Sequence, residues 1–384
     1  MSEKQRPPRP PKVIEPEYTW GETPGGLPEL IWEHAARPLW AQTVPEQDGV
    51  LLMELTRMMY RRASTGEVLW QEVARDFPDE LAADAHGLVF VHGAGVAELD
   101  PASGRQRWRQ RPGGTISGLL LTSDTAFVST HGPLFALNRQ NRQQRWRTPC
   151  AWEPELSVYP EAGLLLVDDP ETETIRALDV ATGVQRWEYQ AEGQPVVAGP
   201  LLPDAIAISG HAAGLAAVDV QTGEARWSLV TERTFEAPGV RLGDTLFCTD
   251  GTVHALDVAT GAVRWQRTLE DDEDGVFALR VHRGVLYAET WRGRLLALSP
   301  EDGTLRWERS LGQIHGLTGD EKTLFLRVHI AEPVGRWCVL AVDVATGELR
   351  WEMIARRMVP DVTRFGDLLV VELKNQVLTF RIGT

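Results

Sequence analysis

The stretch ALDVATGVQRW, residues 177–187, carries an unusual density of reactive side-chain types. A carboxylate (Asp179), a hydroxyl (Thr182) and a guanidinium (Arg186) lie within eight residues, beside the indole of Trp187. Such groups are typical of acid–base and anion-binding sites. Whether the stretch is a site depends on how often it recurs.

The stretch recurs along the whole chain. Close copies are AVDVQTGEARW (217–227), ALDVATGAVRW (255–265), ALSPEDGTLRW (297–307) and AVDVATGELRW (341–351), and weaker copies start at residues 60, 98 and 136. Each copy ends in a tryptophan: Trp70, Trp108, Trp146, Trp187, Trp227, Trp265, Trp307 and Trp351. A repeat of about 40 residues indicates propeller blades or helical repeats.

The local pattern favours propeller blades. Short β-rich runs are bounded by Gly, Asp and Pro, and helical spacing is absent. In one unit we expect an inner strand at 235–242, then strands at 245–249 and 252–258, and an outer strand at 262–269. The sequence therefore predicts an all-β fold, a β-propeller of four-stranded blades.

The repeated residues then have structural roles. Glycine adopts the positive φ of a hairpin turn without a Cβ penalty, and the turn glycines include Gly183, Gly223, Gly261 and Gly347. Asp179 and Thr182 can accept hydrogen bonds from turn amides. Trp187 can fill the gap between neighbouring blades, beside the small Ala177. Strand alternation points Arg186 away from the indole, where its charge discourages edge-to-edge pairing.

The pattern A-x-D-x-x-T-G-x-x-x-W resembles the tryptophan-docking repeat of the quinoprotein (PQQ-dependent dehydrogenase-like) β-propellers, over residues 60–382. The same repeat type is found in the non-catalytic scaffold propeller of the outer-membrane barrel assembly machinery. One unit departs from the pattern, with Asn141 and Arg142 in place of Thr-Gly, so we expect a distorted turn there. The chain also lacks the adjacent cysteine pair that often lies beside the cofactor of the dehydrogenases.

Ring closure allows two blade counts. Residues 358–382 hold only three strands, so a segment near the N-terminus must supply the fourth. Residues 28–34 are a candidate, because Trp32 precedes Trp70 by the repeat spacing. The resemblance favours eight blades, and this spacing makes nine possible. We expect a disordered Pro-rich arm at 1–25 and a single propeller at 26–384, closed by strands from both ends.

Composition limits the partners. A net charge of −15 opposes binding to nucleic acid. No apolar run is long enough to cross a membrane, and the first residues do not read as a secretory signal. Three widely spaced cysteines, Cys150, Cys248 and Cys338, suggest reduced thiols. These features favour a cytoplasmic, monomeric protein.

The non-repeating loops hold the candidate functional residues. These loops lie on the face opposite the Thr-Gly turns. The candidate residues in them are Trp152, Trp291, Trp337, His92, His131 and His211. The aromatic residues could anchor a partner or cap the sheets. The acidic runs at 168–173 and 270–274 could bind calcium but lack EF-hand spacing, and the three histidines could bind zinc only if the fold brought them together.

No catalytic motif accompanies the repeat, so the sequence favours a non-catalytic scaffold for protein–protein interaction, without a cofactor and with an unidentified protein partner. The resemblance leaves a PQQ-dependent dehydrogenase as one alternative. A small-molecule or glycan sensor that uses the central channel is another.

Overall fold

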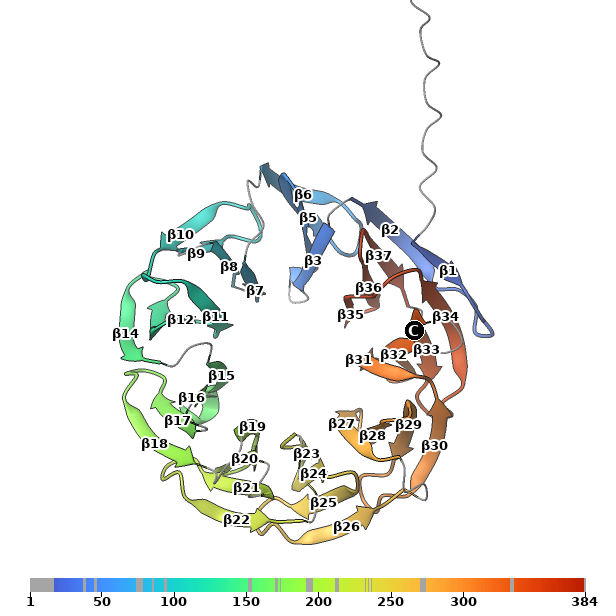
Figure 1. The fold of residues 1–384 in the computed structure, drawn as a ribbon. Coiled ribbons are helices and arrows are strands. Elements are labelled where there is room, and N and C mark those ends of the chain that lie inside the picture. The colour runs from blue at the N-terminus through green and yellow to red at the C-terminus, as the bar shows by residue number, and fades with distance from the viewer. Residues whose placement is uncertain are drawn as a thin grey trace, which may run out of the picture.

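The computed structural model is a ring of antiparallel sheets arranged around a central axis (Figure 1). It describes residues 17–382, apart from short gaps at 37–38, 45–46, 74–78, 85, 93–94, 151–153, 170–171, 173, 191–195, 211–213, 232, 234, 236, 270–273 and 332–334. Each sheet is one blade, with its first strand nearest the centre of the ring and its fourth at the outer rim. There are nine blades, so the spacing of Trp32 indicated the correct count and the family habit of eight does not hold here.

Blades 1–3 follow one another in sequence. Blade 1 consists of β3 (Leu39–Val44), β4 (Gly49–Glu54), β5 (Arg57–Arg62) and β6 (Val68–Val73). Blade 2 consists of β7 (Glu80–Ala83), β8 (Leu88–His92), β9 (Gly95–Leu99) and β10 (Gln106–Gln110). Blade 3 consists of β11 (Ile116–Leu121), β12 (Thr125–Thr130), β13 (Pro133–Asn138) and β14 (Gln144–Pro149).

Blades 4–6 repeat the same order. Blade 4 consists of β15 (Glu155–Tyr159), the 3-10 turn η2 (Pro160–Ala162), β16 (Leu164–Asp169), β17 (Thr174–Asp179) and β18 (Gln185–Gln190). Blade 5 consists of β19 (Val196–Leu201), β20 (Ala205–Gly210), β21 (Gly214–Asp219) and β22 (Ala225–Leu229). Blade 6 consists of β23 (Val240–Leu242), β24 (Thr245–Thr249), β25 (Val253–Asp257) and β26 (Val263–Arg267). The predicted strands of this unit are confirmed, with a shorter inner strand.

The last blades join the two ends of the chain. Blade 7 consists of β27 (Val276–His282), β28 (Val285–Thr290), β29 (Arg294–Leu298) and β30 (Leu305–Ser310). Blade 8 consists of β31 (Gln313–Gly319), β32 (Thr323–Ile330), β33 (Arg336–Asp343) and β34 (Leu349–Ala355), with β1 (Tyr18–Trp20) as a fifth strand. Blade 9 consists of β35 (Asp361–Phe365), β36 (Leu368–Leu373), β37 (Gln376–Arg381) and β2 (Glu29–Ala35).

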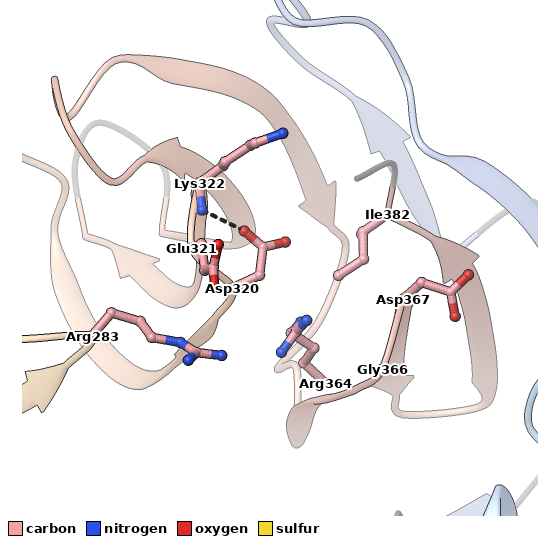
Figure 2. A pocket seen from close by; sticks show the side chains of 8 residues that line it. All are labelled: Arg283, Asp320, Glu321, Lys322, Arg364, Gly366, Asp367 and Ile382. Atoms are coloured by element: carbon pink, nitrogen blue, oxygen red, sulfur yellow. Dashed lines mark hydrogen bonds between the residues drawn. The ribbon is translucent and has the colours of Figure 1, made fainter.

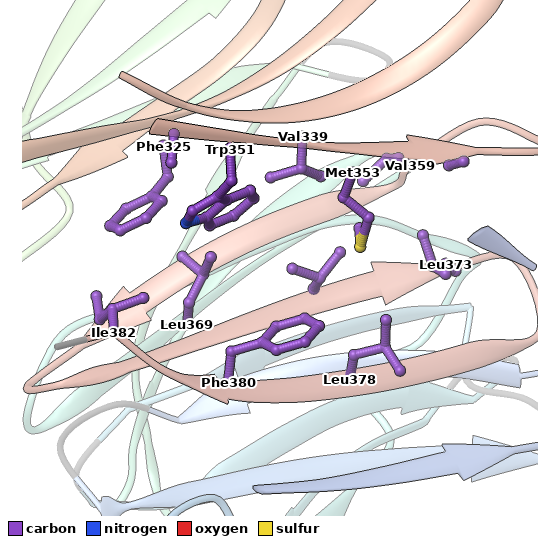
Figure 3. Packing of buried hydrophobic residues seen from close by; sticks show 13 residues of the cluster. Phe325, Val339, Trp351, Met353, Val359, Leu369, Leu373, Leu378, Phe380 and Ile382 are labelled. Carbon is purple, nitrogen blue, oxygen red and sulfur yellow. The ribbon is translucent and has the colours of Figure 1, made fainter. Parts of the chain in front are cut away.

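Strand β2 closes the ring as residues 28–34 suggested. It pairs antiparallel with β37, with Glu33 opposite Leu378. Strand β1 pairs with β34, and Trp20 packs edge-on against Trp351 and Phe380, at centroid distances of 5.7 and 5.8 Å. The propeller therefore begins before residue 26, because Tyr18 and Trp20 pack against the hydrophobic cluster between blades 8 and 9. Figure 3 shows buried residues of this cluster.

The core lies between the blades, and the repeated tryptophans fill it. Trp187 is 6% exposed, and its Nε1 donates to the carbonyl of Val220 in blade 5 at 2.9 Å. Six other indoles donate in the same way across blade junctions: Trp32 to Ala63, Trp70 to Pro101, Trp146 to Val180, Trp227 to Val258, Trp265 to Pro300 and Trp307 to Val344. The predicted docking role is confirmed at these junctions.

Each docked indole packs on the turn glycine of the next blade. Gly223 has φ of 76°, and a Cβ there would lie 2.9 Å from Trp187. Gly183, Gly261 and Gly347 have φ near 70° and face Trp146, Trp227 and Trp307 in the same way. Glycine is thus required both for the left-handed turn and for close approach of the ring.

The junction between blades 2 and 3 differs from the others. Arg142 occupies the glycine position with φ of 67°, so the turn keeps its backbone shape and the expected distortion is absent. The indole hydrogen bond differs from that of the other junctions, because Trp108 Nε1 donates to Glu98 Oε2 of its own blade, at 3.1 Å, and not to a carbonyl of the next blade. Glu98 also accepts from Arg139 Nε at 3.0 Å, and both side chains are almost fully buried. An ion pair therefore takes part in packing this junction.

The three cysteines lie on different blades, and none of them forms a disulfide bond. Cys248 and Cys338 are buried, and burial raises the pKa of both, for Cys338 to about 12. Among the described residues, no helix is long and apolar enough to cross a membrane.

Candidate functional site on the loop face

The reactive groups of the opening stretch are used by the turn itself. Asp179 Oδ1 accepts from the amides of Ala181 and Thr182, and Oδ2 accepts from Arg186 at 2.5 Å. The Arg186 guanidinium holds the pKa of Asp179 below its usual range. The same ion pair recurs in Asp219–Arg226, Asp257–Arg264 and Asp343–Arg350. The repeat is therefore structural. Its arginine stabilises the turn through this ion pair and also places a positive charge on the outer strand.

The antiparallel order places the second-to-third and fourth-to-first connections on the face opposite these turns, here called the loop face. His131 is exposed between β12 and β13, His92 ends β8, Trp291 follows β28 and Trp337 lies in β33. Trp152 and His211 lie outside the described residues. The described residues form two pairs on adjacent blades, at separate places in the ring: His92 and His131 on blades 2 and 3, and Trp291 and Trp337 on blades 7 and 8.

Of the two predicted anchor tryptophans that lie in the described part of the chain, Trp291 is the more exposed. It is 56% exposed and stacks on Phe277 of the inner strand β27, with centroids 4.6 Å apart and planes at 28°. The amide of Trp291 donates to the Gly275 carbonyl at 3.1 Å, which fixes the backbone of the loop. A stacked aromatic pair on a fixed loop gives a partner a rigid apolar surface at low entropic cost.

Trp337, on the next blade, is flanked by two histidines. Its ring centroid lies 4.7 Å from that of His315 and 5.1 Å from that of His329. Burial, Arg327 and His329 together lower the pKa of His315, which favours the neutral imidazole. Sequence reasoning selected Trp337 from the loops and missed Phe277, His315 and His329, because these three lie in strands β27, β31 and β32.

The two acidic runs, 168–173 and 270–274, differ in the interactions that their described carboxylates make. Asp274 is buried, accepts from the Arg292 amide at 3.0 Å and pairs with Arg294 at 2.8 Å, so it orders the loop that carries Trp291. Asp168 faces Glu155 across the β15–β16 pair, and burial with the charges of Glu155 and Asp169 raises its pKa to about 6. In the described part of the chain, no group of three or more His, Cys, Asp or Glu is arranged to hold a metal ion.

The donor set does not match the cofactor site that the dehydrogenase resemblance implies. The adjacent cysteine pair is replaced by single thiols after β14, in β24 and in β33, on three different blades. No carboxylate cluster for a calcium ion lies among the described residues. We therefore derive no catalytic step through a quinone.

Three cavities lined by described residues lie between blades. One of ≈390 Å³ adjoins Trp108 and Arg139 between blades 2 and 3. One of ≈240 Å³ lies between β3 and blade 9, beside Glu372. One of ≈290 Å³ spans the inner turns of blades 7, 8 and 9 on the face of the Thr-Gly turns (Figure 2).

Curated relatives include two kinds of protein. The outer membrane protein assembly factor BamB of Yersinia pestis is 24% identical over 265 residues, covering 60% of this chain and 63% of the relative. The serine/threonine-protein kinase AfsK of Streptomyces coelicolor is 30% identical over 149 residues, covering 38% of this chain and 18% of the kinase. The match thus spans less than two thirds of the length of either relative.

Solved structures share the fold at low identity. BamB from Moraxella catarrhalis aligns with a TM-score of 0.55 and 16% identity, over 79% of this chain and 96% of that one. A quinohemoprotein alcohol dehydrogenase from Pseudomonas putida aligns with a TM-score of 0.52 and 14% identity, over 92% and 76%. The family model described as outer membrane protein assembly factor BamB matches residues 92–246 and 249–380, and the chain therefore belongs to this family of PQQ-like propellers.

Proposed function

We propose that this protein is a non-catalytic scaffold that binds a protein partner through the loop face of blades 7 and 8. The carrying observation is Trp291, which stays 56% exposed while its ring is stacked on Phe277. A propeller needs its tryptophans between blades, and this one is not used there. Membership of a family described as an assembly factor supports the same kind of role.

The surroundings of Trp291 suit a protein anchor. Asp274 and Arg294 hold the loop beneath it, so binding would order few additional residues. Trp337 provides a second aromatic surface on the neighbouring blade. The net charge of −15 favours a partner with a basic surface, through electrostatic steering.

The test compares two single variants in quantitative affinity capture from native extract. Trp291→Ala should lower recovery of a specific partner by roughly five- to thirtyfold, as loss of an anchor worth about 1–2 kcal/mol does. Val184→Ala is the matched control, because Val184 is 64% exposed and lies on the opposite face. Recovery should then be repeated with the purified partner to obtain dissociation constants.

Both variants should unfold like the wild type, because both side chains are exposed. If the partner binds Trp291→Ala as tightly as Val184→Ala, the loop face of blades 7 and 8 is not the docking surface. A loss confined to Val184→Ala would place docking on the turn face instead.

A further inference from the structure

Two arginines face one cavity on the turn face, here the face that carries the Thr-Gly turns. The cavity of ≈290 Å³ is bounded by Arg283 of blade 7, the turn of Asp320 and Lys322 in blade 8, and Arg364 of blade 9. Figure 2 shows the guanidinium groups of Arg283 and Arg364 extending into the same space. Within the described part of the chain, neither side chain makes a hydrogen bond or ion pair, and Arg364 Nε is shielded from solvent.

Arg283 is held in a backbone conformation that is costly for its side chain. It is the first residue of a two-residue hairpin turn and has φ of 49°. Blades 6 and 9 have Gly243 and Gly366 at the corresponding position, each with φ of 58°. A side chain in this left-handed region costs about 1–2 kcal/mol. Such strain without a local contact is typical of a residue retained for a function.

Two of the three carboxylates around the cavity, those of Asp320 and Asp367, interact with other groups. Asp320 Oδ1 accepts from the amides of Lys322 and Thr323, each at 2.7 Å. Asp367 lies 3.5 Å from Arg381 Nε, and its carboxylate points away from the two guanidinium groups in Figure 2. Glu321 is exposed to solvent at the rim. The two guanidinium groups therefore remain available to a ligand.

The larger cavity between blades 2 and 3 provides a contrast. It is also lined by arginines, but Arg107 pairs with Glu98 and Asp100, and Arg139 pairs with Glu98 and Asp84. At Arg107 and Arg139 a ligand anion would have to displace protein carboxylates; only Arg142, the third arginine that lines this cavity, has no carboxylate partner among the described residues. The cavity of blades 7–9 imposes no such competition on Arg283 and Arg364.

We propose that this cavity binds a small, doubly charged oxyanion, either a phosphate or a dicarboxylate. Each guanidinium presents a planar fork of N–H donors that matches the oxygen atoms of such a group. A volume of ≈290 Å³ restricts the ligand to a small molecule. The site is separate from the loop face, so its test does not depend on the proposed scaffold role.

The experiment is isothermal titration calorimetry of the full chain with inorganic phosphate and, separately, with succinate. We expect saturable binding of at least one probe. Arg283→Gly and Arg364→Gln should each weaken it by at least roughly tenfold, because each removes a charged hydrogen-bonding group. Binding should also weaken as ionic strength rises.

Arg142→Gly is the matched control. Arg142 is also an arginine at positive φ, in the turn of blade 3, so the variant makes the same change of charge and backbone away from this cavity. Its affinity should stay within about twofold of the wild type. Arg283→Gly should unfold at a temperature no lower than the wild type, because glycine suits its backbone.

The outcomes separate clearly. Binding of phosphate alone or succinate alone supports the site and identifies the ligand class. Absence of saturable binding to both probes overturns the proposal, as does unchanged affinity in both Arg283→Gly and Arg364→Gln. Loss of binding in Arg142→Gly alone would also overturn it, since that would place the anion between blades 2 and 3.

Discussion

Replacing Trp187 by alanine should destabilise the ring at the junction of blades 4 and 5. The side chain is 6% exposed, so almost all of the roughly 150–250 Å² that such a ring buries returns to water or borders a cavity. At about 25 cal/mol per Å² this area corresponds to roughly 4–6 kcal/mol. Residual burial in the unfolded chain lowers the estimate, and we expect a loss of about 3–5 kcal/mol in the free energy of unfolding.

The assay is urea unfolding followed by far-ultraviolet circular dichroism, which does not depend on the removed fluorophore. Trp291→Ala is the matched control, because the same substitution at an exposed site should change the free energy by less than about 0.5 kcal/mol. Trp187→Phe should fall between the two, since it keeps an aromatic ring but leaves the Val220 carbonyl without its donor, at a cost of about 1–3 kcal/mol. A loss below about 1 kcal/mol in Trp187→Ala would refute the docking role.

Three further predictions follow from packing, burial and the donor set. Gly261→Ala should lower the free energy of unfolding, measured by thermal unfolding, by more than about 2 kcal/mol, because a Cβ there would lie 2.6 Å from Trp227 at φ of 71°. The control is Gly243→Ala, which should show the backbone strain alone, because Gly243 has φ of 58° and no atom within 4 Å of an added Cβ. Equal losses of stability in the two variants would contradict the packing argument. Burial raises the pKa of Glu372 to about 7, so the folded state binds this proton more tightly than the unfolded state, and the free energy of unfolding falls as pH rises from 5 to 8. Glu372→Gln should reduce that fall, measured by urea unfolding at a series of pH values. An unchanged pH profile in the variant would show that this carboxyl does not cause the fall. Adding PQQ and calcium should give no stoichiometric complex in absorbance titration and no dye reduction with alcohols, and turnover would overturn the non-catalytic assignment.

The sequence predicted the features that repeat. The tryptophan spacing gave the blade architecture, and Trp32 pointed to the strand that closes blade 9. Asp179 and Gly183 were correctly interpreted as turn residues. These assignments succeed because a blade imposes the same packing and turn geometry on every copy.

Departures from the repeat could not be predicted in the same way. The strand Tyr18–Trp20 is too short to show a pattern, and its place on β34 depends on where the closed ring leaves an edge. The ion pair of Glu98 and Arg139 joins residues of two blades at a junction where tryptophan docking changes. The contact of Trp291 with Phe277 likewise depends on a loop and a strand outside the motif.

The closure of blade 9 by β2 also has a consequence for the order of folding. Glu29–Ala35 can pair only after β37, whose residues 376–381 lie more than three hundred positions later in the chain. Such pairing has a high entropic cost and is slow, because the two segments must come together before any hydrogen bond between them can stabilise the chain. During synthesis the early blades can form from local hairpins, while β2 waits as an unpaired edge strand. A chaperone or a transient partner that covers this strand would therefore protect the nascent protein from aggregation until the ring closes.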